Sequence, residues 1–173
     1  MDLTHLSRMI RDVPDFPKPG ILFKDITPLL QDPVAMADCA RELSAPFRDS
    51  QVDRVLGIES RGFILGPLVA RELHAGFVPV RKAGKLPWEV LRASYALEYG
   101  RDTIEMHVDA VRRGHVVLVV DDLIATGGTA HAACDLAERA GGRVCGLSFL
   151  VELAGLGGRD RLEGRRVHSV FQF

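Results

Sequence analysis

Two adjacent acids precede a run of small residues that could hold a phosphate group. Asp121 and Asp122 follow the apolar run 116–120, and a small-residue turn comes just behind them, ahead of a helical pattern. Glycines at the start of a helix let successive backbone N–H groups point at one anion, and the helix dipole adds positive potential there. Threonine hydroxyls are further donors. We therefore predict that a terminal phosphate binds at Ala125, Thr126, Gly127, Gly128 and Thr129.

The two acids restrict what the rest of the ligand can be. Carboxylates beside a phosphate site would repel a ligand made only of phosphates. A ribose 5-phosphate avoids this, because its 2- and 3-hydroxyls can donate to Asp121 and Asp122, and the sugar becomes oxocarbenium-like when its C1 bond breaks. The patterns Gly-x-x-x-x-Gly-Lys-Ser/Thr and Gly-x-Gly-x-x-Gly do not occur. The plainer alternative is a strand that ends in two solvated acids and a glycine turn.

Further charged residues fall at the ends of two other predicted strands. The strands 54–58 and 76–80 are continuous apolar runs, which are typical of a parallel sheet covered on both faces. Ligands of such sheets bind beyond the carboxyl ends of the strands, so residues there are predicted to meet at one site. These residues are Glu59, Ser60 and Arg61 after the first strand, and Arg81, Lys82 and Lys85 after the second.

The elements that position these residues alternate along the chain, which indicates an α/β fold with a mostly parallel sheet flanked by helices. Asp32-Pro33 is typical of a helix start, because aspartate caps free N–H groups and proline fits the first turn. The segment 16–25 is too irregular for a regular element. Behind a short amphipathic N-terminal helix, we expect helices at 33–47, 62–73 and 127–140, and strands at 54–58, 76–80, 94–98, 103–107, 116–120, 144–151 and 167–171.

Length and composition restrict the class of protein. The 173 residues predict one domain, and the net charge of −1 argues against a nucleic-acid binder, which needs a basic surface. No apolar run approaches the roughly 18 residues of a membrane span, and the N-terminus lacks a signal peptide's apolar stretch. The three cysteines and six histidines have no metal-ligand spacing, so we expect reduced thiols, no zinc site and a cytoplasmic protein.

The stretch 116–130 resembles the phosphoribosyl-pyrophosphate (PRPP) motif of the type I phosphoribosyltransferases. The resemblance implies a type I phosphoribosyltransferase-like core, with about residues 1–30 contributing a small hood and 82–100 a flexible lid. It also implies a reaction of purine salvage, in which adenine and PRPP give AMP and pyrophosphate with inversion at C1. Four further stretches resemble the adenine-specific members of that family in collinear order: 16–30, 57–70, 80–100 and 149–153.

The resemblance also assigns roles to single residues. Phe23 would stack on adenine, with backbone groups of Leu22 and Lys24 at the ring edge and Leu153 on the opposite face. The family commonly has arginine where Lys24 stands, a departure that a backbone contact tolerates. Pyrophosphate would be bound by the charged strand ends, partly through a strained peptide between Glu59 and Ser60. The residues assigned to it are Glu59, Ser60, Arg61, Arg81, Lys82 and Lys85.

Glu98 and Tyr99 lie in the expected lid. In the family the matching glutamate meets N7 of adenine, so a protonated Glu98 would donate to N7 of bound AMP and its carboxylate would accept that proton in synthesis. Tyr99 would stand beside it, and Asp121 and Asp122 complete the catalytic set. Magnesium would be held mainly by PRPP and water, with no ligands from protein side chains. Some of the cations would act across a homodimer interface.

Two alternatives stay open. A transferase for hypoxanthine, guanine or xanthine must read a 6-oxo group, commonly with a lysine after the PRPP motif, but the segment 147–153 carries only the acid Glu152. A PRPP-sensing regulator without catalysis would usually carry a nucleic-acid-binding element, for which 173 near-neutral residues leave little room. The sequence therefore favours an adenine-specific enzyme over both.

Overall fold

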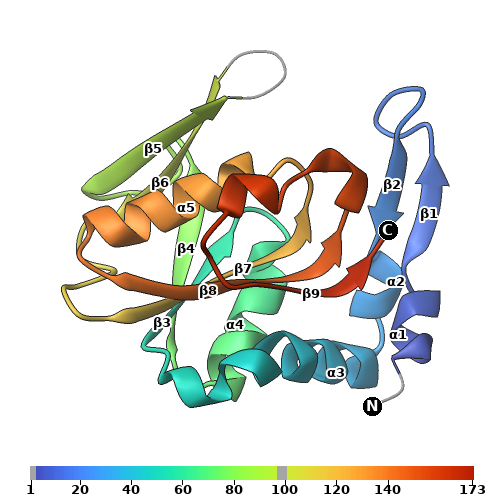
Figure 1. Ribbon diagram of the computed structural model, residues 1–173, viewed down its shortest axis with the longest axis horizontal. Coiled ribbons are helices and arrows are strands. Elements are labelled where there is room, and N and C mark those ends of the chain that lie inside the picture. The colour runs from blue at the N-terminus through green and yellow to red at the C-terminus, as the bar shows by residue number, and fades with distance from the viewer. Residues whose placement is uncertain (1–2, 97–100) are drawn as a thin grey trace.

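A seven-stranded sheet forms the centre of the protein (Figure 1). The structure is a computed structural model that describes residues 3–96 and 101–173. Five strands run parallel, and β5 and β6 form an antiparallel hairpin beside β4, so the predicted mostly parallel α/β core is confirmed. In the order β5-β6-β4-β3-β7-β8-β9, the strands are Val90–Ala96, Arg101–His107, Gly76–Lys82, Arg54–Ile58, Val116–Ile124, Arg143–Glu152 and Val167–Gln172.

Both faces of the sheet are covered, which explains why the central strands read as unbroken apolar runs. On β7, Val117 and Val119 pack into the core beneath the helix α5. Leu118 and Val120 point the other way, into a second core formed with the remaining helices. The helices are α1 (Thr4–Arg8), α2 (Thr27–Leu30), α3 (Pro33–Ser44), α4 (Gly62–Glu72) and α5 (Gly128–Arg139), with 3-10 turns at Ala45–Ser50, Ala154–Leu156 and Asp160–Leu162.

The start of α3 follows the local sequence. One carboxylate oxygen of Asp32 accepts hydrogen bonds from the backbone N–H groups of Val34 and Ala35, both at 2.8 Å, and proline occupies the first turn. The predicted cap is therefore confirmed. The helix ends at Ser44, earlier than the apolar spacing suggested, and Phe47 is buried from the following 3-10 turn instead.

Strand β7 is longer than predicted, and the difference changes the position of the two acids. It continues to Ile124, with Asp121 paired to Phe149 and Leu123 paired to Val151 of β8. The acids thus lie within a strand rather than after one. Polar side chains do not end a strand whose backbone still has a hydrogen-bonding neighbour.

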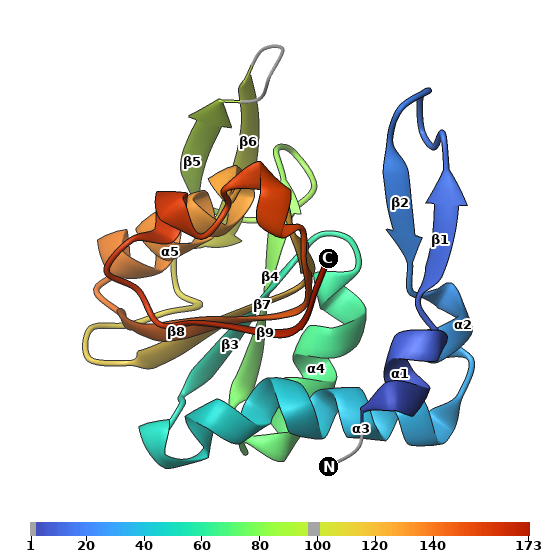
Figure 2. The same cartoon turned by 45° about the vertical axis from the view of Figure 1, so that its right-hand side comes forward.

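The prediction that residues 16–25 form no regular element was wrong. Leu22–Asp25 forms β2, which pairs antiparallel with β1 (Arg11–Pro14) in a separate two-stranded sheet. The prolines and glycine that made the segment look irregular fall in the loop between these strands. Figure 2 shows that this hairpin and the β5–β6 hairpin project past the same end of the main sheet. Among the described residues, no helix is long and apolar enough to cross a membrane.

Candidate active site

The predicted site residues meet because β3 stops before its neighbour β7 does. The last paired residues of β3 and β7 are Gly57 and Val120. Beyond them β7 continues to Ile124, paired with β8. The side chains beyond that point border an open pocket of about 440 Å³. Its lining consists of Glu59, Ser60, Arg61, Lys82, Lys85, Asp121, Asp122 and Leu123.

A second pocket, of about 120 Å³, adjoins the first. It is lined by the small-residue turn that the sequence predicts as a phosphate cradle, together with Leu123, Ile124 and Phe149. Asp121 and Leu123 border both pockets, so a ligand held in one can extend past Asp121 into the other. The cradle residues at this pocket are Ala125, Thr126, Gly127, Gly128 and Thr129.

Gly127 is required at the start of α5 for two reasons. Its φ of +75° lies in the left-handed region, and a Cβ there would lie 2.4 Å from the carbonyl oxygen of Gly158. A Cβ on Gly158 would in turn lie 2.3 Å from the carbonyl oxygen of Ala125. The cradle is therefore backed by a second glycine turn, which sequence reasoning missed because 31 positions of chain separate the two glycines (158 minus 127).

The acid pair is poorly solvated and only partly compensated. Asp121 accepts a hydrogen bond from the backbone N–H of Asp122 at 2.8 Å. The Oδ2 atom of Asp122 lies 3.0 Å from Nη1 of Arg61 but has no hydrogen-bond partner within the described structure. Burial raises the pKa of both carboxyls; the charge of Asp122 raises the pKa of Asp121 further, whereas Arg61 opposes the shift at Asp122. The pair is thus suited to a site where positive charge or hydroxyl donors arrive with the ligand.

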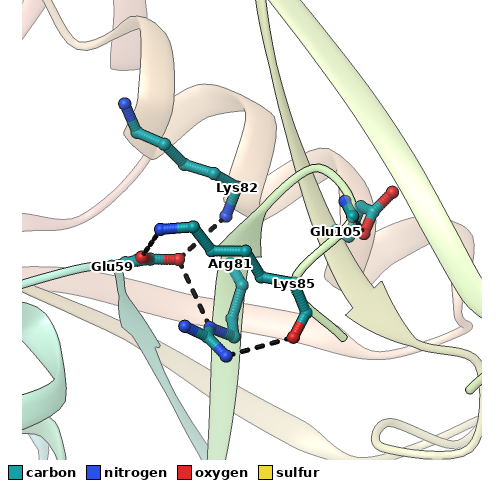
Figure 3. Close-up of polar contacts among 6 residues, drawn as sticks. Glu59, Arg81, Lys82, Lys85 and Glu105 are labelled. Carbon is teal, nitrogen blue, oxygen red and sulfur yellow. Dashed lines mark hydrogen bonds and ion pairs between the residues drawn. The ribbon is translucent and has the colours of Figure 1, made fainter. Parts of the chain in front are cut away.

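Glu59 is bonded to cations at the end of β4 and in the loop that follows it (Figure 3). Its carboxylate accepts from Nε of Arg81 at 3.3 Å and from the backbone N–H of Lys82 at 3.1 Å, and it forms an ion pair with Lys85. Burial alone would raise the pKa of Glu59, but these hydrogen bonds together lower it. The Glu59–Ser60 peptide is cis, and it is the peptide that the resemblance singles out for pyrophosphate contact.

Two acids of β6, which the sequence did not reveal as partners, bind residues at the end of β4 and in the loop after it. The buried Glu105 accepts from the backbone N–H of Gly84 at 2.9 Å and from Nε of Arg92 at 2.7 Å. Asp102 lies 3.5 Å from Nζ of Lys82 and accepts from Tyr95 at 3.2 Å. The sequence of β6 does not indicate which residues its acids will contact, because the pairing of β4, β5 and β6 determines those partners.

The hairpin of β1 and β2, which lies in the segment predicted to form the hood, reaches the same region. Arg61 lies over the ring of Phe23, 5.0 Å from its centroid, so the residues predicted to bind base and pyrophosphate are in contact. Lys24 is buried, pairs with Asp12 at 2.6 Å and lies over the ring of Phe173. Its side chain therefore joins β2 to the C-terminal residue, a role that the prediction of a backbone contact did not include. Leu22 is exposed and Leu153 half-buried; the backbone N–H of Leu153 donates to Ile124.

The predicted lid is described only in part. Glu98 and Tyr99 lie outside the described residues. The preceding loop carries Trp88, which is 57% exposed and contacts the ring of His107 edge-on. Trp88 therefore stands largely in solvent, three residues along the chain from Lys85.

Comparisons with known proteins agree with this geometry. The phosphoribosyl transferase domain family matches residues 27–168. The chain is 58% identical over 168 residues to the adenine phosphoribosyltransferase of Solibacter usitatus, covering 97% of each. Its structure matches that of the adenine phosphoribosyltransferase from Rhodothermus marinus with a TM-score of 0.95 at 57% identity, covering 99% of this chain and 98% of that one. An APRTase from Giardia lamblia complexed with 9-deazaadenine matches with a TM-score of 0.93 at 40% identity, covering 100% and 98%.

Proposed function

Because this chain belongs to the phosphoribosyl transferase domain family, and within it to the adenine phosphoribosyltransferases, we propose that it joins adenine to PRPP and forms AMP and pyrophosphate for purine salvage. The observation that carries the proposal is the junction of two pockets at Asp121. One pocket has the backbone donors for a 5-phosphate and the other has the cations for pyrophosphate. Ribose is the group that connects those two anions in PRPP, and it would lie over the acids between them.

The acids act on the sugar. Asp121 and Asp122 accept hydrogen bonds from the ribose hydroxyls and stabilise the positive charge that develops as the C1 bond to pyrophosphate breaks. Their raised pKa values support this role, since a buried carboxylate pair gains most from a positive charge arriving beside it. The cradle from Ala125 to Thr129 holds the 5-phosphate in place at the start of α5, whose N-terminus favours an anion.

The leaving group binds where the cations gather. Ser60 and Arg61 bind pyrophosphate from the end of β3, and Arg81, Lys82 and Lys85 bind it from the end of β4. Glu59 belongs to the same site through its hydrogen bonds with Arg81 and Lys82. Charge-assisted hydrogen bonds stabilise pyrophosphate as negative charge accumulates on it.

Adenine binds beneath the hood, with its ring on Phe23, the backbone of Leu22 and Lys24 at its edge, and Leu153 opposite. Glu98 exchanges the N7 proton as N9 attacks C1, and Tyr99 stands beside it in the lid. A 6-oxopurine is disfavoured, because the segment 147–153 has no lysine to donate to the 6-oxo group. Its one charged residue is the acid Glu152, which accepts from Arg159 at 3.0 Å and from Gln172 at 3.3 Å.

Magnesium fits this site as a companion of the substrate. Among the residues that the structure describes, no group of three or more His, Cys, Asp or Glu side chains could hold a metal ion. An ion there would take most of its ligands from PRPP and water, as hard oxygen donors. When bound, it neutralises charge on the departing pyrophosphate.

The remaining features of the proposal concern the state of the protein. We place all 173 residues in one phosphoribosyltransferase domain, with about residues 1–30 forming the hood over the base. A homodimer follows from the family, in which some of the pyrophosphate-binding cations act across the interface. The three cysteines are free thiols, which supports a reducing cytoplasmic environment.

The decisive experiment is the formation of AMP from PRPP and adenine in magnesium buffer, with hypoxanthine, guanine and xanthine tested in parallel. We expect turnover with adenine and little with the three 6-oxopurines. Preferential turnover of a 6-oxopurine would replace the substrate, and PRPP binding without turnover of any base would indicate a regulator.

A further inference from the structure

The cations proposed to bind pyrophosphate are already paired inside the protein. Arg61 lies 3.0 Å from Asp122, and Lys82 lies 3.5 Å from Asp102. Arg81 and Lys85 both form ion pairs with Glu59. The ligand-free site is thus closer to neutral than its four cations suggest, and an incoming anion meets carboxylates that compete for the same donors.

Glu59 is the main competitor. Figure 3 shows its carboxylate facing Arg81, the backbone nitrogen of Lys82 and the ammonium group of Lys85. Arg81 and Lys82 are the last two residues of β4, and Lys85 follows in the next loop. The side chain of Glu59 is 11% exposed, whereas those of Arg81 and Lys85 are 34% and 46% exposed. Glu59 thus borders the open space together with Lys85 but is much less exposed, so a ligand arriving from solvent meets mainly the cations.

We propose that Glu59 is an internal counter-anion, which holds the donors of Arg81, Lys82 and Lys85 in place in the ligand-free protein and is displaced from them when pyrophosphate binds. The proposal rests on the function assigned above and specifies how its pyrophosphate site works. Glu59 does not bind the ligand in this scheme, because two anions repel. It acts through Arg81, Lys82 and Lys85, as a positioning residue.

The geometry requires an exchange of partners. The backbone N–H of Lys82 is a single donor, and it is directed at Glu59. Arg81 uses Nε on Glu59 and Nη1 on the carbonyl oxygen of Lys85, at 3.1 Å. Pyrophosphate can gain these donors only if Glu59 gives them up, which leaves a mostly buried carboxylate next to a multiply charged ligand. Glu59 therefore weakens pyrophosphate binding and favours its release.

Glu59→Gln tests this, because glutamine keeps the size and an oxygen for the Lys82 N–H but removes the charge. We expect the Kd of inorganic pyrophosphate, measured by calorimetry, to fall about fivefold, on the scale of one ion pair removed from competition. Asp135→Asn is the matched control: it removes one negative charge from a surface pair on α5 and should leave the Kd unchanged. A merely structural Glu59 would give weaker binding, so the sign of the change decides.

Titrations with and without magnesium separate the outcomes. Tighter binding to Glu59→Gln in both supports the proposal. Equal or weaker binding overturns it, and a loss of affinity seen only with magnesium would make Glu59 a metal-binding group instead. If Glu59→Gln does not fold, Glu59→Asp is the second variant: its shorter side chain draws the carboxylate away from Arg81 and Lys85, and its Kd is judged by the same criterion. If the wild type forms AMP but Glu59→Gln binds pyrophosphate no more tightly, only this inference is refuted. If the wild type forms no AMP, the proposed function itself is refuted.

Discussion

Two buried acids in this protein have opposite surroundings. Glu105 on β6 and Asp122 on β7 are 1% and 4% exposed. Both oxygens of Glu105 accept hydrogen bonds, from Arg92 and from the backbone of Gly84. One oxygen of Asp122 faces Arg61 without a hydrogen bond. The bond from Arg92 lowers the pKa of Glu105 more than burial raises it, whereas burial raises the pKa of Asp122.

The difference separates an acid that stabilises the fold from one that the fold tolerates. The charge of Glu105 is stabilised by the folded state, because its partners are in place before any ligand arrives. The charge of Asp122 is disfavoured by the folded state, since burial removes its water and supplies only one cation in return. Buried acids left incompletely paired in a pocket are candidates for ligand contact. Asp121 shares this condition.

Glu98 should give the largest effect among the acids proposed to act on the ligand. Glu98→Gln keeps the size but cannot exchange the N7 proton, so we expect kcat to fall roughly 10²-fold with little change in PRPP affinity. Steady-state kinetics of AMP formation measure this, and Glu89→Gln, an exposed acid within the expected lid segment 82–100, is the control. Near-normal kcat would mean that the proton has another route, and a collapse of PRPP affinity would make Glu98 a structural residue of the lid.

Asp122→Asn should separate activity from stability. We expect kcat to fall by roughly an order of magnitude or more, because one electrostatic contact to the sugar cation is lost. Thermal unfolding at neutral pH should move to higher temperature, since the buried charge is removed. Wild-type turnover would refute the catalytic role, and a lowered Tm would show that the pairing with Arg61 outweighs the effect of burial.

Glu105→Gln should give the reverse result. The carboxylate partner of Arg92 is lost while an acceptor for Gly84 is kept, so the free energy of unfolding should fall by about 1–3 kcal/mol. Denaturant titration measures the loss, with Glu163→Gln, an exposed acid, as the control. The value of kcat should change little. A kcat effect as large as that of Asp122→Asn would place Glu105 with the acids that serve the ligand and end the distinction.

The pH dependence of stability should show the two classes with opposite signs, as the smallest effect. Asp121 and Asp122 have raised pKa values in the folded state, so their contribution is lost as pH rises from the ordinary carboxyl value of about 4 to the raised values. Glu105 has a lowered pKa, so its contribution is lost as pH falls below about 4. The free energy of unfolding should therefore decrease as pH rises from about 4 toward neutrality in the wild type. It should decrease less in Asp122→Asn. Equal slopes would contradict the raised pKa values.

Local sequence determined the features that depend on neighbours along the chain. The cap of α3 at Asp32 needs only the N–H groups two and three residues ahead. The order of strands and helices followed from apolar runs, and Gly127 followed from the turn that opens α5. The gathering of charged strand ends at one edge was also predictable, because parallel strands end on the same side of a sheet.

Tertiary structure decided which acids are paired and where the strands end. Nothing near Glu105 in the sequence indicates that Gly84 and Arg92 will bond to it, and nothing near Gly127 indicates that Gly158 will lie against it. The strands β1 and β2 form only because Arg11–Pro14 and Leu22–Asp25 pair with each other. Hydrogen bonds and close packing depend on distance in space, and the chain brings such partners together only when the whole sheet has formed. The types of the site residues are written in the sequence, whereas the charge state of each acid depends on partners that only the fold supplies.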